Sequence, residues 1–183
     1  MSRVGIFLAD GFEEIEGLTV VDILRRAGID ISMISINGKK KVTGAHGIAL
    51  DTDEDIVQCD PDKLDMLVLP GGMPGTTNLA ACEKLTEALK KADQEKRGIA
   101  AICAAPSVLG DLGFLKGKKA VCYPGFESRL TGAEVLAVPV VTDGHITTSR
   151  GMGTAIAFAL ELTKRLKDEE TAKQIGRSII YNV

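Results

Sequence analysis

Short apolar runs alternate with helical segments along this chain, and this alternation limits the folds available to it. Residues 4–9 form a continuous apolar run, residues 12–27 carry apolar side chains three or four positions apart, and residues 29–36 alternate apolar and polar. This order is typical of a strand, a helix and a second strand, with Gly28 as the glycine that ends the helix. Such a unit joins parallel strands through a right-handed crossover.

The same alternation continues toward the end of the chain. Apolar runs at 66–69 and 99–102 predict two more buried strands. The pattern therefore predicts one domain over residues 1–183, built on a doubly wound α/β sheet. An amphipathic helix is expected over 82–96, with Leu85, Leu89 and Ala92 on its apolar face. The other expected elements are a hairpin of 41–42 with 48–50, an acidic loop over 51–65, strands over 119–123, 134–141 and 145–149, and helices over 154–166 and 169–179.

The composition argues against several classes of function. The chain has 183 residues and a formal net charge of −3, which does not favour nucleic acid or an anionic membrane surface as a partner. No apolar run approaches the roughly 20 residues of a membrane helix, and the first residues lack a signal-peptide pattern, so a cytoplasmic location is expected. The cysteines form no C-x-x-C pair and there are only two histidines, so the spacing predicts free thiols and no metal site.

Cys103 stands between a predicted strand and a predicted helix start. The apolar run 99–102 precedes it, and Pro106 suits a first helical turn, where a missing N–H costs nothing. A cysteine on such a turn lies near unpaired helix N–H groups, which favour its thiolate form. The alternative is a buried cysteine that acts only as a small hydrophobic side chain.

Unusual residues follow four of the predicted strands. In a doubly wound sheet the site lies outside the carboxyl ends of the strands, so these four segments are expected to meet at one edge, around Cys103. They carry Glu13, Glu14 and Glu16 after 4–9, Gly71 and Gly72 after 66–69, Cys103 after 99–102, and Arg150, Gly151 and Gly153 after 146–149.

The glutamates allow a structural and a functional interpretation. The helix dipole alone explains Glu13 and Glu14, since an acidic residue in the first turn stabilises a helix by about 0.3–1 kcal/mol. Glu16 lies deeper, and a carboxyl aimed at Cys103 would be partly desolvated, which raises its pKa. A protonated Glu16 could donate a hydrogen bond to the thiolate or move a proton of a bound substrate.

The glycines and the arginine at this edge also allow two interpretations each. Gly71 and Gly72 suit a tight turn that needs a positive φ. Alternatively, the Gly72 N–H faces Cys103 and forms an oxyanion hole together with the Ala104 N–H. Arg150 and the glycines beside it could bind an anion, although we favour a structural ion pair for this arginine.

Neither histidine is close to Cys103 in the sequence. His46 lies in the predicted hairpin turn, His145 lies far along the chain, and Ala104 directly follows the cysteine. This argues against a self-contained Cys–His nucleophile of the protease type. It also weakens a glutamine-amidotransferase assignment, which needs a His-x-Glu late in the chain.

Four motifs in register carry a family resemblance over nearly the whole chain. They are Ala-Asp-Gly-Phe-Glu-Glu-Ile-Glu at 9–16, Leu-Pro-Gly-Gly at 69–72, Ala-Ala-Ile-Cys-Ala-Ala-Pro at 100–106 and Thr-Ser-Arg-Gly-Met-Gly-Thr at 148–154. Together they resemble the DJ-one branch of the ThiJ/PfpI superfamily. The resemblance implies a homodimer with a three-layer flavodoxin-like sandwich, similar to class I glutamine amidotransferases. It also implies a nucleophilic, easily oxidised Cys103, a protonated Glu16 as its partner, and an anion pocket at Gly72 and Ala104.

The resemblance further implies a set of activities. These are cofactor-free glyoxalase activity that converts methylglyoxal to lactate, deglycation of protein or nucleotide adducts, redox-linked chaperone action and protection against oxidative stress. The partners would be small reactive aldehydes or glycated adducts, with Gly71, Tyr123 and Arg150 lining the site. The human-type branch of the family has a histidine where this sequence has Tyr123. Glu16 would therefore move protons alone or with Tyr123.

Three functions remain open from the sequence. A cofactor-free enzyme would add the Cys103 thiolate to an aldehyde, with the oxyanion on the Gly72 and Ala104 amides and Glu16 moving the proton. A non-enzymatic sensor or chaperone would instead oxidise Cys103 to the sulfinate. A catalytically silent domain would leave the Cys103 pKa at its usual value of about 8.5.

Overall fold

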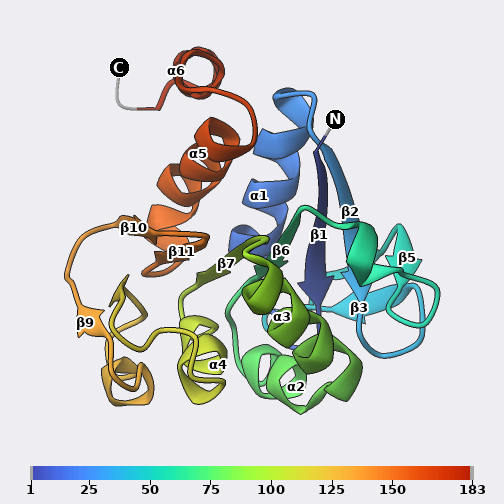
Figure 1. Cartoon of the computed structure of the whole chain (residues 1–183). Coiled ribbons are helices and arrows are strands. Elements are labelled where there is room, and N and C mark those ends of the chain that lie inside the picture. The colour runs from blue at the N-terminus through green and yellow to red at the C-terminus, as the bar shows by residue number, and fades with distance from the viewer. Residues whose placement is uncertain (1, 182–183) are drawn as a thin grey trace.

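A seven-stranded sheet forms the centre of the structure (Figure 1), a computed structural model that describes residues 2–181. Its strands are β1 (Arg3–Leu8), β2 (Asp30–Ser35), β5 (Glu54–Asp55), β6 (Met66–Leu69), β7 (Gly98–Ile102), β10 (Val140–Asp143) and β11 (Ile146–Ser149). They lie in the order β10-β11-β7-β6-β1-β2-β5. All neighbours are parallel except the antiparallel pair β10–β11. The predicted parallel sheet is thus confirmed, with one antiparallel edge strand.

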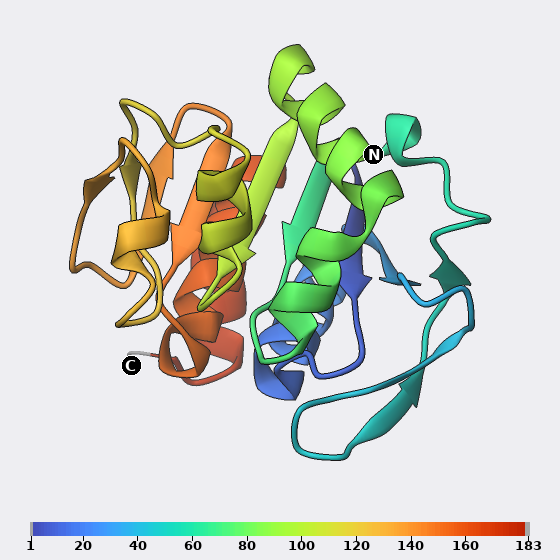
Figure 2. The same ribbon diagram turned by 90° about the horizontal axis from the view of Figure 1, so that it is seen from below.

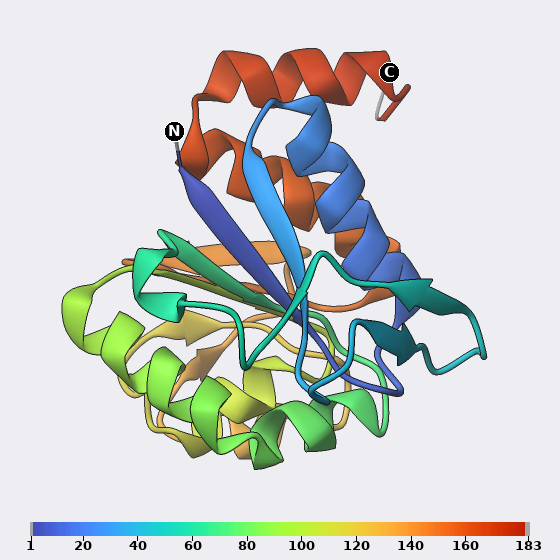
Figure 3. The same ribbon diagram turned by 90° about the vertical axis from the view of Figure 1, so that its right-hand side faces the viewer.

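Helices cover both faces of this sheet (Figures 2 and 3). The helices are α1 (Glu14–Arg26), α2 (Gly75–Ala81), α3 (Glu83–Glu95), α4 (Pro106–Asp111), α5 (Ala155–Leu166) and α6 (Glu169–Ser178). Helices α1 and α5 pack together on one face and α6 lies against α5, whereas α2, α3 and α4 cover the other face. This arrangement confirms the predicted three-layer, flavodoxin-like α/β fold. Within residues 2–181, no helix is long and apolar enough to cross a membrane.

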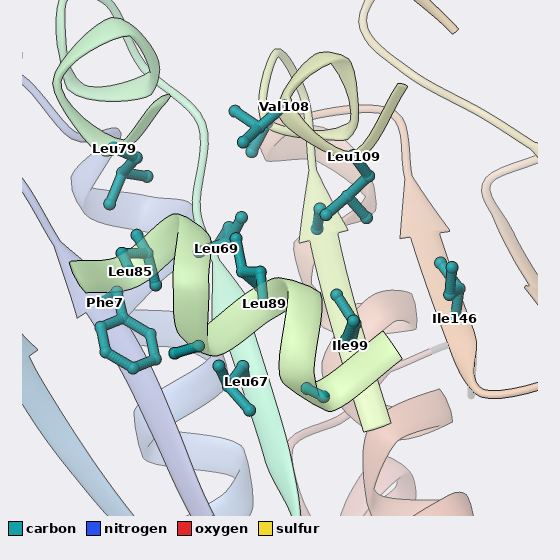
Figure 4. Packing of buried hydrophobic residues seen from close by; sticks show 14 of the residues in the cluster. Phe7, Leu67, Leu69, Leu79, Leu85, Leu89, Ile99, Val108, Leu109 and Ile146 are labelled. Atoms are coloured by element: carbon teal, nitrogen blue, oxygen red, sulfur yellow. The ribbon is translucent and has the colours of Figure 1, made fainter. Parts of the chain in front are cut away.

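Each face of the sheet has its own hydrophobic core. Figure 4 shows the core under α2, α3 and α4, where leucines of the helices meet those of β6. Leu85, Leu89 and Ala92 are fully buried, which confirms the predicted apolar face of α3. Each fully buried leucine stabilises the fold by roughly 1.5–3 kcal/mol. The second core lies under α1 and α5, so β1, β6 and β7 are held from both sides and their carboxyl ends are fixed in place.

Most predicted elements are present, with small shifts at their ends. Helix α1 begins at Glu14 because Glu13 is its extended N-cap residue, with φ −80° and ψ 114°. Gly28 follows the helix with a φ of 70°, the left-handed conformation that glycine adopts at this position without strain. The predicted hairpin is formed by β3 (Lys41–Thr43) and β4 (Ala49–Asp51).

The predicted acidic loop over residues 51–65 is partly wrong. It contains the edge strand β5, which pairs with β2, and a short 3-10 helix at Pro61–Lys63. The Asp53 carboxylate accepts hydrogen bonds from the Met33 N–H and from Arg25, both at 2.8 Å. These bonds tie the acidic segment to the sheet, which its local sequence did not indicate. Helix α2 was also missing from the prediction.

The single strand predicted over residues 134–141 is wrong. The structure has two separate strands there: β9 (Glu134–Val135) pairs with β8 (Lys119–Ala120), and β10 pairs with β11 in the main sheet. Pro139 lies between β9 and β10. Proline has no N–H to donate to a sheet ladder, so an unbroken strand through this position is disfavoured.

Candidate active site

Cys103 lies at the sharp turn between β7 and α4. Its φ is 66°, a left-handed conformation that costs a non-glycine residue roughly 1–2 kcal/mol. Two backbone hydrogen bonds hold this conformation: the Cys103 N–H donates to the Ser149 carbonyl at 3.0 Å, and its carbonyl accepts from the Tyr123 N–H at 2.8 Å. Pro106 begins α4, as expected. The cysteine is half-buried at the carboxyl edge of the sheet, where neighbouring loops meet.

Glu16 reaches this edge from the first turn of α1. Its side chain is buried, with 1% of the residue exposed, and its Oε2 atom accepts a hydrogen bond from the Gly71 N–H at 2.8 Å. Its Oε1 atom is buried without a hydrogen-bond partner among residues 2–181. The Glu16 carboxyl and the Cys103 thiol are close enough for each to shift the pKa of the other.

Gly71 is required by the close approach of Glu16 and Cys103. A Cβ atom added at Gly71 would lie 2.5 Å from the Cys103 Cβ, 2.7 Å from Glu16 Oε2 and 3.0 Å from Cys103 Sγ. Any larger residue would push the carboxyl and the thiol apart. Gly71 therefore acts by leaving space, in addition to the hydrogen bond that its N–H donates.

Gly72 and Ala104 present backbone N–H groups to the cysteine sulfur. Gly72 has a φ of 90°, and a Cβ atom there would lie 2.3 Å from the Glu13 nitrogen, so only glycine fits. The two N–H groups come from different loops, one after β6 and one after β7. The structure thus brings both groups of the predicted anion pocket to the same sulfur.

The Glu16 carboxyl and the Cys103 thiol titrate as a pair. Burial raises the pKa of Glu16 to about 7, and the charge of Glu13 adds to this, against the lowering effect of the Cys103 thiol and the Gly71 N–H. Burial, followed by the charge of Glu16 and its contact with the thiol, raises the pKa of Cys103 to about 12. At a pH between these two pKa values, the pair holds one proton.

The expectation of a lowered thiol pKa is therefore corrected. The N–H groups of Gly72 and Ala104 do lower the pKa of Cys103, as predicted, but burial and the neighbouring carboxyl outweigh them. The Cys103 thiol therefore holds its proton more strongly than an ordinary cysteine thiol.

Gly151 lies close to the Tyr123 ring and to the Glu16 carboxyl. A Cβ atom added at Gly151 would lie 3.2 Å from the Tyr123 ring and 3.9 Å from Glu16 Oε1. The Tyr123 side chain is half exposed, so it stands at the mouth of the site. The structural ion pair favoured for Arg150 is absent among residues 2–181; its charge instead lowers the pKa of Cys122.

The other three cysteines lack this environment. Burial raises the pKa values of both Cys59 and Cys122 to about 11, and Cys82 is a half-buried free thiol. Only Cys103, within residues 2–181, has a buried carboxyl and two N–H groups at its sulfur. The structure thus contains one candidate nucleophile.

Glu14 and His46 are the residues that sequence reasoning missed. Glu14 is buried, and its carboxylate accepts hydrogen bonds from the His46 N–H at 2.8 Å, from His46 Nδ1 at 2.9 Å and, more weakly, from the Ile48 N–H at 3.4 Å. The helix dipole alone therefore does not explain Glu14. Gly44 is the sequence feature linked to this contact, because a Cβ atom there would lie 2.2 Å from Glu14 Oε1.

Glu13, Glu14 and His46 are also the one group of three metal-ligating side chains found in the described part of the chain. Their ligand atoms lie within 4.8 Å of one another. The Glu14 oxygens already accept hydrogen bonds from the imidazole and the backbone N–H of His46. We therefore interpret this group as a hydrogen-bonded His–carboxylate cluster beside the site.

The fold and this elbow together define a flavodoxin-like protein with a cysteine at the nucleophile position. The chain belongs to the DJ-1/PfpI family, which matches residues 2–165. It is 37% identical over 180 residues to protein DJ-1 homolog B of Arabidopsis thaliana, covering 97% of this chain but only 41% of that protein. It is 34% identical over 167 residues to a protein of Pyrococcus abyssi named a deglycase, covering 90% of this chain and 99% of that one. A solved structure of Toxoplasma gondii DJ-1, described as oxidized, superposes with a TM-score of 0.96 at 34% identity, and each chain is covered fully.

Proposed function

We propose that this chain is a Cys103-dependent, cofactor-free enzyme acting on small reactive aldehydes, with glyoxalase or deglycase activity. The observation that carries the proposal is the close approach of the buried Glu16 carboxyl to Cys103 at Gly71, beside the Gly72 and Ala104 N–H groups. The name of the Pyrococcus abyssi relative supports a substrate of the carbonyl-adduct class. Methylglyoxal represents these small reactive aldehydes in the mechanism.

The first step forms a covalent adduct on Cys103. When the shared proton lies on Glu16, the thiolate attacks the aldehyde carbon, a C–S bond forms, and the carbonyl electron pair moves to oxygen. The Gly72 and Ala104 N–H groups stabilise the resulting oxyanion. Glu16 then gives its proton to that oxygen, which leaves a neutral hemithioacetal and a carboxylate.

The second stage moves a proton between adjacent carbons. The Glu16 carboxylate removes the proton from the carbon bonded to sulfur, and the electron pair moves to the neighbouring carbonyl oxygen to give an enediolate. Glu16 returns this proton to the neighbouring carbon, and the hydroxyl proton on the carbon bonded to sulfur passes to the neighbouring oxygen, which gives a lactoyl thioester. Water hydrolyses the thioester to lactate, a proton and the free thiol. The balance is one methylglyoxal and one water for one lactate and one proton, with no external oxidant.

The test of this proposal is lactate formation from methylglyoxal by Cys103→Ser. We expect the variant to lose all measurable turnover, because the serine hydroxyl is a far weaker nucleophile than a thiolate. Cys122→Ser is the matched control, since that buried thiol has no carboxyl partner, and it should retain turnover. Wild-type turnover in Cys103→Ser would rule out the mechanism.

A second candidate function is oxidative sensing. The description of the Toxoplasma gondii structure as oxidized favours it, and the N–H groups at the sulfur suit an anionic sulfinate. One thiolate would react with two peroxide molecules to give a sulfinate and two waters. Peroxide titration followed by intact mass separates the two functions. A gain of two oxygens that is lost in Cys103→Ser, in a protein without carbonyl turnover, would favour the sensor.

We also propose that the protein acts as a cytoplasmic homodimer. Large apolar side chains are exposed at several positions, two of them on α1, and their burial between two copies of the chain would favour association. They include Ile15, Leu18, Met152 and Ile180. Light scattering on Leu18→Asp tests the dimer: we expect a shift from twice the chain mass to the chain mass, and an unchanged dimer would contradict this surface.

A further inference from the structure

The structure brings a histidine to the glutamates that follow β1, and it comes from an unexpected element. The hairpin β3–β4 folds across the start of α1, where the Ala45 N–H donates to the Phe12 carbonyl at 2.8 Å (Figure 2). This contact places His46, at the tip of the hairpin, beside the glutamates that follow β1. The two regions lie more than 30 residues apart in the chain, with a separation of 32 between Glu14 and His46.

Glu14 holds the imidazole of His46 in one orientation. The buried carboxylate accepts the Nδ1 proton at 2.9 Å and the backbone N–H of the same residue at 2.8 Å. Nε2 is thereby left as the nitrogen that exchanges protons with the surroundings, and the His46 side chain is 67% exposed. A buried carboxylate on Nδ1 is the arrangement that fixes the tautomer of catalytic imidazoles.

Glu13 connects this imidazole to the catalytic pair. Its Oε2 atom lies 3.6 Å from His46 Nδ1, and its N–H donates to the Gly71 carbonyl at 2.9 Å. Its negative charge acts on Glu16 directly. Glu13 therefore lies beside His46 and carries a charge that raises the pKa of Glu16.

The charges around these groups determine the sign of the effect. His46 faces Glu13 and Glu14 on α1, and both carboxylates favour its protonated form. Glu16 faces Glu13, the Cys103 thiol and the Gly71 N–H. A positive charge at His46 offsets the negative charge of Glu13, so it makes the loss of a proton from the Glu16–Cys103 pair easier.

We propose that His46, held by Glu14, is a positioning residue for the Cys103 reaction: by compensating Glu13 it sets the pH at which the Glu16–Cys103 pair releases its first proton. The inference rests on the proposed function only through that pair. It also assigns a role to a histidine in a chain that has none directly after its nucleophile.

The test is the pH dependence of Cys103 alkylation by iodoacetamide. In H46Q we expect the midpoint to rise by about half a pH unit, which slows alkylation roughly threefold on the acidic side of the midpoint. H46R restores a positive charge and should return the midpoint to that of the wild type. H145Q is the matched control, since His145 is also bonded to a carboxylate, Asp93, at 2.8 Å, but lies at the amino end of β7. It should leave the midpoint unchanged.

Glu13→Gln supplies an effect of opposite sign. Removal of the negative charge of Glu13 should lower the midpoint. Adding H46Q to E13Q should then shift the midpoint less than H46Q does alone, because Glu13 favours the protonated form of His46. This variant also decides the question if H46Q does not fold. Three outcomes would each overturn the proposal. The midpoint could stay unchanged in E13Q, it could be equal in H46Q and H145Q, or it could be displaced in H46R as far as in H46Q.

Alkylation needs no carbonyl turnover, so the two proposals can fail separately. A wild-type protein that forms no lactate would contradict the proposed function, yet its alkylation midpoint would still respond to His46. An active enzyme whose midpoint ignores His46 would contradict only the role of the histidine.

Discussion

Glu14 and Glu16 lie two positions apart in the first turn of α1. Both are buried, with 2% of Glu14 and 1% of Glu16 exposed. Their pKa values nevertheless move in opposite directions. Burial acts to raise the pKa of Glu14, but the bonds from the His46 ring and from backbone N–H groups, including those of His46 and Ile48, lower it below its usual value. For Glu16, burial prevails and the pKa rises to about 7.

The difference shows that hydrogen-bond donors help to separate the two roles. Glu14 faces the hairpin, which surrounds its carboxylate with protons and keeps it charged. Glu16 faces the elbow, where one N–H and a thiol leave an oxygen unpartnered. A carboxyl with a pKa near neutrality can hold or release a proton during a reaction, whereas a permanently charged carboxylate can only orient its neighbours.

The largest expected effect comes from removing the proton-transfer group. Glu16→Gln should reduce methylglyoxal turnover by about 10²–10⁴-fold, the usual contribution of general acid–base catalysis. Glu14→Gln should reduce it by less than about tenfold, because Glu14 acts only through His46 and Glu13. Steady-state rates of lactate formation at pH 7 measure both effects. Equal losses in the two variants would break the distinction between the glutamates.

Folding stability should depend on pH in opposite ways at the two positions. The raised pKa of Glu16 favours the folded state below its unfolded pKa of 4.5, and this contribution is lost as the pH rises through about 7. The free energy of unfolding of Glu16→Gln, relative to the wild type, should therefore increase by about 3 kcal/mol between pH 4.5 and 8.

Glu14 provides the reverse case for the same measurement. Its lowered pKa contributes stability above the unfolded value, and that contribution is lost as the pH falls through the folded pKa. Glu14→Gln should therefore be less stable than the wild type at neutral pH, and the difference should shrink toward acid pH. Urea unfolding at a series of pH values measures both variants, and parallel curves for the two would contradict the assignment.

The glycines beside the two carboxyls sharpen the comparison. Gly71→Ala places a methyl group against Cys103 and Glu16, so we expect at least a tenfold loss of turnover, since reacting groups displaced by about 1 Å lose activity strongly. Gly44→Ala crowds Glu14 and should cost about 1–3 kcal/mol of stability, with turnover changed only a few-fold. Gly153→Ala, where no atom lies within 4 Å of the added carbon, is the control. A tenfold loss of turnover in Gly44→Ala would contradict the separation.

The sequence alone was enough to predict the elements that repeat and the edge where their loops meet. The apolar runs that became β1, β6 and β7 are continuous because those strands are buried on both faces. Parallel strands of this kind direct their carboxyl ends to one edge, so Glu16, Gly71, Gly72 and Cys103 could be grouped before any coordinates were known. The sequence around Cys103 also predicted its turn, because Pro106 marks the helix start.

What the tertiary structure decided depends on contacts between distant segments. No local pattern brings His46 to Glu14 or ties Asp53 to β2, and none indicates that Arg150 has no ion pair within residues 2–181. The pKa of Cys103 is the clearest case: helix N–H groups near the sulfur were predictable, but the burial and the Glu16 charge that outweigh them exist only after the chain has folded. Desolvation and charge interactions depend on distance in space, which the order of residues does not specify.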